Sequence, residues 1–168
     1  MRHFRPAQVA CAVALALGTS TASAQFSNTY FFGDSLSDAG NWQSTGALPA
    51  GTGRFTINPG PVWSEVFASY YGFSATPSTQ GGTNYAWGGA QVTTLPMIVG
   101  QPLNPTQGAP IVAQVQQYLA KGPANPNALY SLFGGPNEVA YQIGLLQQGQ
   151  TTPAGVQAAV TQAAVTLG

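Results

Sequence analysis

The residues best suited to covalent chemistry lie in a short turn at 33–38, which reads Gly-Asp-Ser-Leu-Ser-Asp and follows an apolar run. A serine placed where a buried strand ends exposes its hydroxyl at the edge of a sheet, so Ser35 is a candidate nucleophile. Its own backbone N–H and an adjoining helix N-terminus would favour the negative charge that develops on an attacked carbonyl. The alternative is that Asp34, Ser35 or Asp38 caps a helix, a very common use of these residue types.

Two further glycine-bearing turns offer hydrogen-bond donors for such a site. Residues 84–90 contain Gly88 and Gly89, and consecutive glycines let a backbone N–H come close to a ligand. Residues 134–138 place Asn137 just after an apolar run, where its side-chain amide could donate to an oxyanion. Each of these turns, taken alone, is better explained as an ordinary turn rich in glycine, proline and asparagine.

Taken in order, the three turns resemble the sequence blocks of the SGNH (GDSL) family of serine esterases and lipases. Residues 33–41 match the first block, Gly89 (five residues after Asn84) matches the second, and Asn137 matches the third. The segments 53–56, 60–63 and 126–130 add to the resemblance, which extends from about residue 30 to 141. The last of these segments is most similar to the exported, autotransporter-type esterases. One departure is that Glu138 follows Asn137, where the family usually has aspartate.

The resemblance implies a role for each matched residue. Ser35 would be the nucleophile, and its N–H would form an oxyanion hole with the N–H of Gly89 and the side-chain amide of Asn137. The substrate would be a small-molecule or lipid ester, and no metal or organic cofactor is implied. The autotransporter-type members further imply a C-terminal membrane barrel in the full-length product.

The family's last block, an Asp-x-x-His that supplies the catalytic base and its orienting carboxylate, does not occur in the 168 residues. The sequence has one histidine, His3, and a serine hydroxyl is a poor nucleophile until a base removes its proton. Loss of a triad member costs on the order of 10⁴ to 10⁶ in turnover. We therefore expect this chain alone to be inactive or nearly so, with the aspartate and histidine supplied from beyond Gly168.

Residues 1–24 have the organisation of a secretory signal peptide. Arg2 and Arg5 precede a short apolar run at 9–17, and small residues at 21–24 predict cleavage after Ala24. The alternative is a buried N-terminal helix. After cleavage, residues 25–168 would form the N-terminal portion of an SGNH hydrolase domain without cysteine or histidine. We expect this product to be exported, and either secreted or displayed at the outer membrane.

Composition argues against several other classes of function. The formal net charge is zero and only 5% of the residues are charged, so no basic surface is predicted that could bind nucleic acid or an acidic membrane. One cysteine and one histidine cannot form a zinc site or a disulfide framework. Two interpretations besides an esterase remain open. One is a non-catalytic secreted module that binds carbohydrate or a surface polymer through exposed Trp42, Tyr85 and Trp87; the other is a truncated pseudogene product that does not fold stably.

The turns are positioned by strands that alternate with helices. Apolar runs at 29–32 and 128–133 predict buried strands, and residues 38–60 predict a long surface loop. Periodicity with proline and glycine boundaries predicts helices at 61–71, 110–120, 139–148 and from 152 onwards. The side chains expected to be buried are Trp63, Val66, Phe67 and Tyr70 on the first helix and Ile111, Val115, Tyr118 and Leu119 on the second.

This alternation favours a mostly parallel sheet with helices on both faces. Together with the resemblance it predicts the three-layer α/β/α, flavodoxin-like fold of the SGNH hydrolases. Few strands are visible, and the sequence ends at Gly168 directly after a helix. We therefore expect the domain to be truncated before its last strands.

Overall fold

The computed structural model describes residues 26–46, 60–93, 97–98, 101–102 and 108–168. The predicted signal peptide and the family-like segment 53–56 lie outside the described residues. The main elements are strands β1 (Thr29–Phe32) and β4 (Leu129–Leu132) and helices α2 (Trp63–Tyr70), α3 (Ile111–Leu119), α4 (Pro136–Gln147) and α5 (Pro153–Leu167). Shorter elements are η1 (Gln43–Thr45), η2 (Ser78–Gln80), β2 (Met97–Ile98) and β3 (Gln101–Pro102).

Strand β1 is the centre of a small parallel sheet. Strand β4 pairs with it in parallel, from Thr29 opposite Leu129 to Phe32 opposite Leu132. On the other side of β1, Phe31 forms a parallel bridge with Asn84, and the N–H of Tyr85 donates to the Phe31 carbonyl at 2.7 Å. The strands predicted at 29–32 and 128–133 are therefore confirmed, and the segment at Asn84 is a third strand-like segment beside β1.

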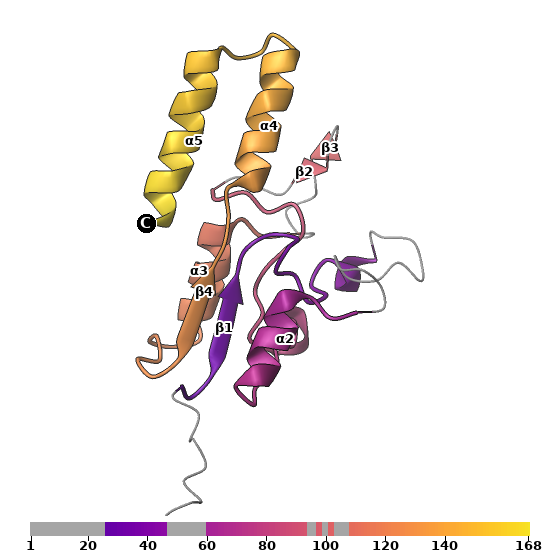
Figure 1. Ribbon diagram of the computed structural model, residues 1–168, viewed down its shortest axis with the longest axis vertical. Coiled ribbons are helices and arrows are strands. Elements are labelled where there is room, and N and C mark those ends of the chain that lie inside the picture. The colour runs from indigo at the N-terminus through magenta and orange to yellow at the C-terminus, as the bar shows by residue number, and fades with distance from the viewer. Residues whose placement is uncertain (1–25, 47–59, 94–96, 99–100, 103–107) are drawn as a thin grey trace, which may run out of the picture.

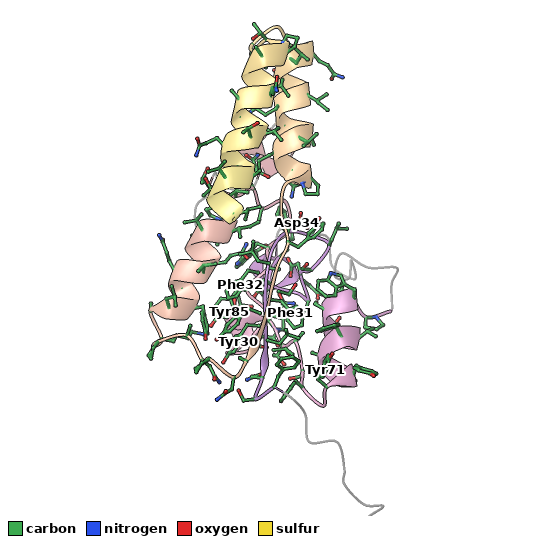
Figure 2. The ribbon with its side chains drawn as sticks, turned by 60° about the vertical axis from the view of Figure 1, so that its left-hand side comes forward. Tyr30, Phe31, Phe32, Asp34, Tyr71 and Tyr85 are labelled. Carbon is green, nitrogen blue, oxygen red and sulfur yellow. The ribbon has the colours of Figure 1, made fainter. Side chains whose placement is uncertain are left out.

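Helices cover both faces of this sheet. Successive side chains of β1 point to opposite faces, and each face has its own apolar cluster. Phe31 packs with Ala68 of α2 and with Ala75, whereas Phe32 packs with Tyr85 and with buried side chains of α3. Figure 2 shows Phe31 on the side of α2 and Phe32 on the side of α3. The mixed α/β architecture with a parallel sheet thus agrees with the expected fold class.

Helix α2 forms as predicted, but its buried face is a different one. The side chains of Trp63, Val66 and Tyr70 are 42%, 56% and 83% exposed, while the buried residues are Ser64 and Ala68. Small side chains at these two positions let the helix approach the sheet closely. Val66 and Tyr70 remain on its outer side, whereas the rings of Trp63 and Phe67 lie against that of Phe31, with centroids 5.6 and 6.3 Å apart.

Helices α4 and α5 stand side by side beyond the ends of β1 and β4 (Figure 1). Helix α4 begins at Pro136, three residues earlier than predicted. No residue of α5 is buried, although Ala163 and Leu167 touch the cluster of Phe32. No helix among the described residues is both long enough and apolar enough to cross a lipid bilayer.

Strand β4 is not buried as expected, since Leu132 is 44% exposed and Tyr130 is 38% exposed. The reason is its place in the sheet. Among the described residues it pairs with β1 on one side and with no strand on the other. The outer edge of β4 is therefore open within the described part of the chain.

Candidate active site

The three candidate turns meet at one edge of the sheet. Because β1, β4 and the segment at Asn84 run parallel, the chain leaves all three at the same end. Ser35 follows β1, Gly89 follows the segment at Asn84, and Asn137 follows β4. Figure 2 shows Asp34 at this end of β1, below the α4–α5 pair. The topology therefore brings together the turns that carry the residues predicted from the sequence.

We call residues 33–38 the nucleophile turn. It closes on itself, because the carbonyl of Asp34 accepts the N–H groups of Ser37 at 3.0 Å and Asp38 at 3.1 Å. The Asp34 side chain also accepts the N–H of Leu36 at 3.0 Å. Ser35 lies at the bend, half-buried, and its hydroxyl has no hydrogen-bond partner among the described residues. Asp34 therefore caps a turn and leaves the Ser35 hydroxyl unengaged. No helix begins within residues 33–38, so the alternative that one of these residues caps a helix is not confirmed.

Asp38 anchors the far end of the nucleophile turn. Its carboxylate is fully buried and accepts four backbone N–H groups, those of Gly40, Asn41, Trp42 and Gly88. Burial raises the pKa of Asp38, and these four hydrogen bonds act in the opposite direction. The bond from Gly88, at 2.9 Å, ties the first block to the second.

The chain at 38–42 is consequently not the surface loop that its composition predicted. All five residues are buried, because Asp38 and Asn41 provide hydrogen-bond partners for the backbone. The side-chain amide of Asn41 donates to the carbonyls of Asn84 at 2.7 Å and Ala86 at 2.9 Å. The amide of Asn84 in turn donates to the Ser37 carbonyl at 2.8 Å. These polar side chains join the first two blocks in the interior.

We call residues 88–92 the oxyanion loop. Gly89 has a φ of +72°, a conformation that glycine adopts without strain and that other residues rarely adopt. The loop is held from the third block: the side-chain amide of Asn137 donates to the Ala90 carbonyl at 2.9 Å. This bond uses one of the two amide hydrogens of Asn137, so the other remains for a ligand.

Glu138 makes a second connection from the third block to the oxyanion loop. Its side chain is 7% exposed, and its Oε1 accepts the N–H of Val92. The departure from the family's usual aspartate therefore coincides with a direct bond to the oxyanion loop.

Two carboxyl groups of the site have an oxygen without a partner in the described part of the chain. These are Oδ2 of Asp34 and Oε2 of Glu138, both buried. Burial raises the pKa of Asp34, and the nearby negative charge of Glu138 raises it further, against the hydrogen bond from the Leu36 N–H. The site is thus acidic. Within the described ranges, no group of three or more His, Cys, Asp or Glu side chains is arranged to hold a metal ion.

One polar residue of the site was not predicted from the sequence. Gln114 lies on α3, at a position that the apolar pattern assigns to solvent, yet its side chain is fully buried. It forms hydrogen bonds with both the N–H and the carbonyl of Gly33. Periodicity cannot detect such a residue, because its partner lies 81 positions away in the chain.

The aromatic residues that might have formed a sugar-binding platform are buried. Trp42, Tyr85 and Trp87 are 3%, 2% and 8% exposed, and the ring of Tyr85 stacks on that of Phe32 with centroids 5.4 Å apart. The expectation that these three rings are exposed for stacking is therefore wrong. They belong to the core that supports the oxyanion loop.

Comparison with known proteins bears on the family of this chain. Residues 30–167 match the family described as GDSL-like Lipase/Acylhydrolase. A protein named Lipase 1, from Photorhabdus luminescens, is 29% identical over 160 residues, which cover 91% of this chain and 21% of the relative. No solved structure matches the chain significantly. Since the family match covers most of the sequence and includes all three blocks, this chain belongs to the GDSL-like lipase/acylhydrolase family.

Proposed function

We propose that the chain is the front part of an exported hydrolase of carboxylic esters, including lipid esters, with Ser35 as its nucleophile. The observation that carries the proposal is the direct bonding between the three turns at one sheet edge. Asp38 accepts the N–H of Gly88, and Asn137 donates to Ala90. Membership of the family supports ester hydrolysis as the reaction.

In this mechanism the Ser35 hydroxyl oxygen attacks the ester carbonyl. The developing oxyanion accepts hydrogen bonds from the backbone N–H groups of Ser35 and Gly89 and from the second amide hydrogen of Asn137. A histidine takes the proton of Ser35 and later donates it to the leaving alcohol. Water then attacks the acyl-enzyme and releases the acid.

We propose that this histidine and its aspartate lie on a segment encoded after Gly168. The chain corresponds to 21% of the length of the Photorhabdus relative, and the outer edge of β4 is open within the described residues. A following parallel strand at that edge would extend the sheet toward the flavodoxin-like, three-layer fold. The same longer product would carry the autotransporter-type membrane barrel, and residues 1–24 would direct its export.

The test uses the full coding frame, expressed with and without the segment that holds Asp-x-x-His. The longer protein should hydrolyse a short p-nitrophenyl ester, and a fluorophosphonate probe should label it in the secreted or outer-membrane fraction. Residues 25–168 alone should show almost no turnover. A frame that reaches a stop codon without Asp-x-x-His, or a longer protein without activity, would overturn the proposal.

A matched pair of serine variants locates the nucleophile. Ser35→Ala should lower turnover on the order of 10⁴-fold or more and abolish labelling. Ser37→Ala is the control, because Ser37 lies in the same turn and its buried hydroxyl has no partner among the described residues. Equal loss in both variants, or full activity of Ser35→Ala, would exclude Ser35 as the nucleophile.

A further inference from the structure

We propose that Gln114 is a positioning residue that sets the orientation of Ser35 by holding the peptide groups of Gly33. The inference rests on the proposed function, because it assigns Gln114 a part in the reactivity of that serine. It touches neither substrate nor the reacting atoms and acts through the backbone of the nucleophile turn.

The side chain of Gln114 is completely satisfied by backbone groups. Its Oε1 accepts the N–H of Gly33 at 2.8 Å, and its Nε2 donates to the carbonyls of Gly33 at 2.8 Å and Ala109 at 2.9 Å. The amide thus pairs with Gly33 as a neighbouring β-strand would, and it does so at the point where β1 has just ended. An amide supplies both a donor and an acceptor in this arrangement without carrying a charge.

The place of Gly33 explains why this pairing matters for Ser35. The nucleophile turn is closed by its own hydrogen bonds to Asp34, and its Ser37 carbonyl is held by Ser64 and Asn84. The far end is fixed at Asp38, which accepts the N–H of Gly88. The near end is Gly33, whose peptide groups Gln114 holds on both sides. Loss of Gln114 would leave the Gly33 N–H without its acceptor and the Gly33 carbonyl with the Trp87 N–H alone, so the start of the turn can shift and carry Ser35 with it.

Packing at Gly33 supports the same conclusion. A Cβ built on Gly33 would lie 2.7 Å from the carbonyl oxygen of Phe133, at the end of β4. The carbonyl of Gly33 also accepts the N–H of Trp87 at 3.0 Å. Gly33 is therefore packed against the residue that follows β4 and bonded to Trp87 of the second turn, and Gln114 fixes it from α3.

A side chain that merely stabilised α3 would not need this chemistry. The neighbouring buried positions of the helix, Ile111 and Tyr118, carry large side chains that belong to the apolar cluster. A glutamine among them is tolerated only because its polar atoms are all bonded. Burying an amide at this position costs desolvation free energy. That cost is explained if the backbone just before Ser35 must be held in one orientation.

The experiment compares Gln114→Met and Gln114→Glu with the controls Gln117→Met and Gln117→Glu in the full-length protein. Gln117 lies on the same helix and is exposed. Methionine fills a similar volume without hydrogen bonds to Gly33. Gln114→Met should lower kcat and the rate of fluorophosphonate labelling by about 10- to 100-fold with little change in KM, since a shift of about 1 Å costs that much. The Gln117 variants should stay within twofold of the parent.

Gln114→Glu adds a readout that a purely structural role would not change. A buried glutamic acid that is protonated can donate to the Gly33 carbonyl and accept its N–H, whereas the ionised form loses the donor. The labelling rate of this variant, divided by that of the parent at the same pH, should therefore rise as the pH is lowered from about 8 to 5. The same ratio for Gln114→Met should stay flat.

The outcomes separate this inference from the proposed function. A parent protein that reacts, with Gln114 variants within twofold of it and a flat ratio for Gln114→Glu, overturns the inference and leaves the function intact. A parent protein that does not react at Ser35 refutes the proposed function. Amide hydrogen exchange of residues 33–38 then decides the structural part: faster exchange in Gln114→Met than in Gln117→Met supports it, and equal exchange overturns it.

Discussion

Replacing Asp38 by alanine should remove about 4 kcal/mol or more from the free energy of unfolding. The carboxylate accepts the N–H groups of Gly40 and Asn41 at 2.8 and 2.6 Å, and those of Trp42 and Gly88 at 3.0 and 2.9 Å. A buried N–H left without an acceptor costs about 1–3 kcal/mol, so four would cost about 4–12 kcal/mol. We expect a loss at the lower end of this range for two reasons. Water can enter the space that the carboxylate leaves and accept some of the N–H groups, and the variant no longer buries a charge.

Two asparagine variants test whether the loss of stability follows the number of hydrogen bonds removed. Asp38→Asn keeps one oxygen, which can still accept the two N–H groups that now bond to Oδ1, so we expect about half the loss, roughly 2 kcal/mol. Asp34→Asn is the matched control. The Asp34 side chain accepts a single N–H, that of Leu36, and its other oxygen has no partner among the described residues. Its replacement should therefore cost less than about 1 kcal/mol.

The assay is equilibrium unfolding in urea, followed by tryptophan fluorescence. Trp42 and Trp87 are both buried, so their emission should shift to longer wavelength when the core opens. The free energy follows from the midpoint and the slope of the transition. A loss below about 1 kcal/mol in Asp38→Ala, or an equal loss in Asp34→Asn, would refute the assigned role of Asp38. If Asp38→Ala does not fold, the graded loss in Asp38→Asn gives the answer.

Two further predictions concern Asp34 and Gly33. Because burial raises the pKa of Asp34 above its ordinary value of 3.8 in the folded protein, the stability it contributes is present below that value and is lost as the pH rises through the folded pKa. The parent should therefore lose stability relative to Asp34→Asn as the pH rises from about 3 to 7. A difference in the free energy of unfolding between the two proteins that does not change with pH would contradict this. Gly33→Ala places a Cβ 2.7 Å from the carbonyl oxygen of Phe133, so the end of β4 must move away. We expect a loss of about 1–3 kcal/mol in urea unfolding and at least about a tenfold drop in ester hydrolysis by the full-length protein, whereas a variant unchanged in both would refute the packing argument.

Local sequence signals were sufficient to place most elements. Apolar runs predict β1 and β4, and the prolines that begin the predicted helices at 110 and 152, with the glycine after α2, mark helix boundaries that the structure confirms to within a few residues. These signals depend on backbone chemistry that acts over a few neighbours. They are insensitive to which side of a helix meets the sheet.

The buried face of α2 illustrates that limit. Periodicity selects four apolar residues, of which Phe67 packs against the cluster of Phe31, and the fully buried positions are Ser64 and Ala68. The hydroxyl of Ser64 donates to the Ser37 carbonyl at 2.9 Å and accepts the amide of Asn84 at 3.1 Å. A polar network inside the fold therefore decides the orientation of the helix. Its members are far apart in the chain, and their pairing is visible only in three dimensions.

The candidate site was predictable in its residues but not in what holds them. The order of the three blocks identifies Ser35, Gly89 and Asn137. The bonds that bring their backbones together start from Asp38, Gln114 and Glu138, and only the structure reveals those pairings. Motifs identify the groups that would meet a substrate, because those groups determine the chemistry. The residues that position them vary with the packing of each chain.

The oxyanion loop shows how these supports combine. On one side of Gly89, the N–H of Gly88 is bound by Asp38 of the first block. On the other side, Asn137 of the third block donates to the carbonyl of Ala90, and Glu138 accepts the N–H of Val92. Gly89 is thus fixed between anchors from two different blocks, so in the mechanism that we propose its N–H would not need to reorganise when charge develops on a substrate. A longer acidic side chain at position 138 is compatible with this arrangement, because what the loop requires is an acceptor that reaches its backbone.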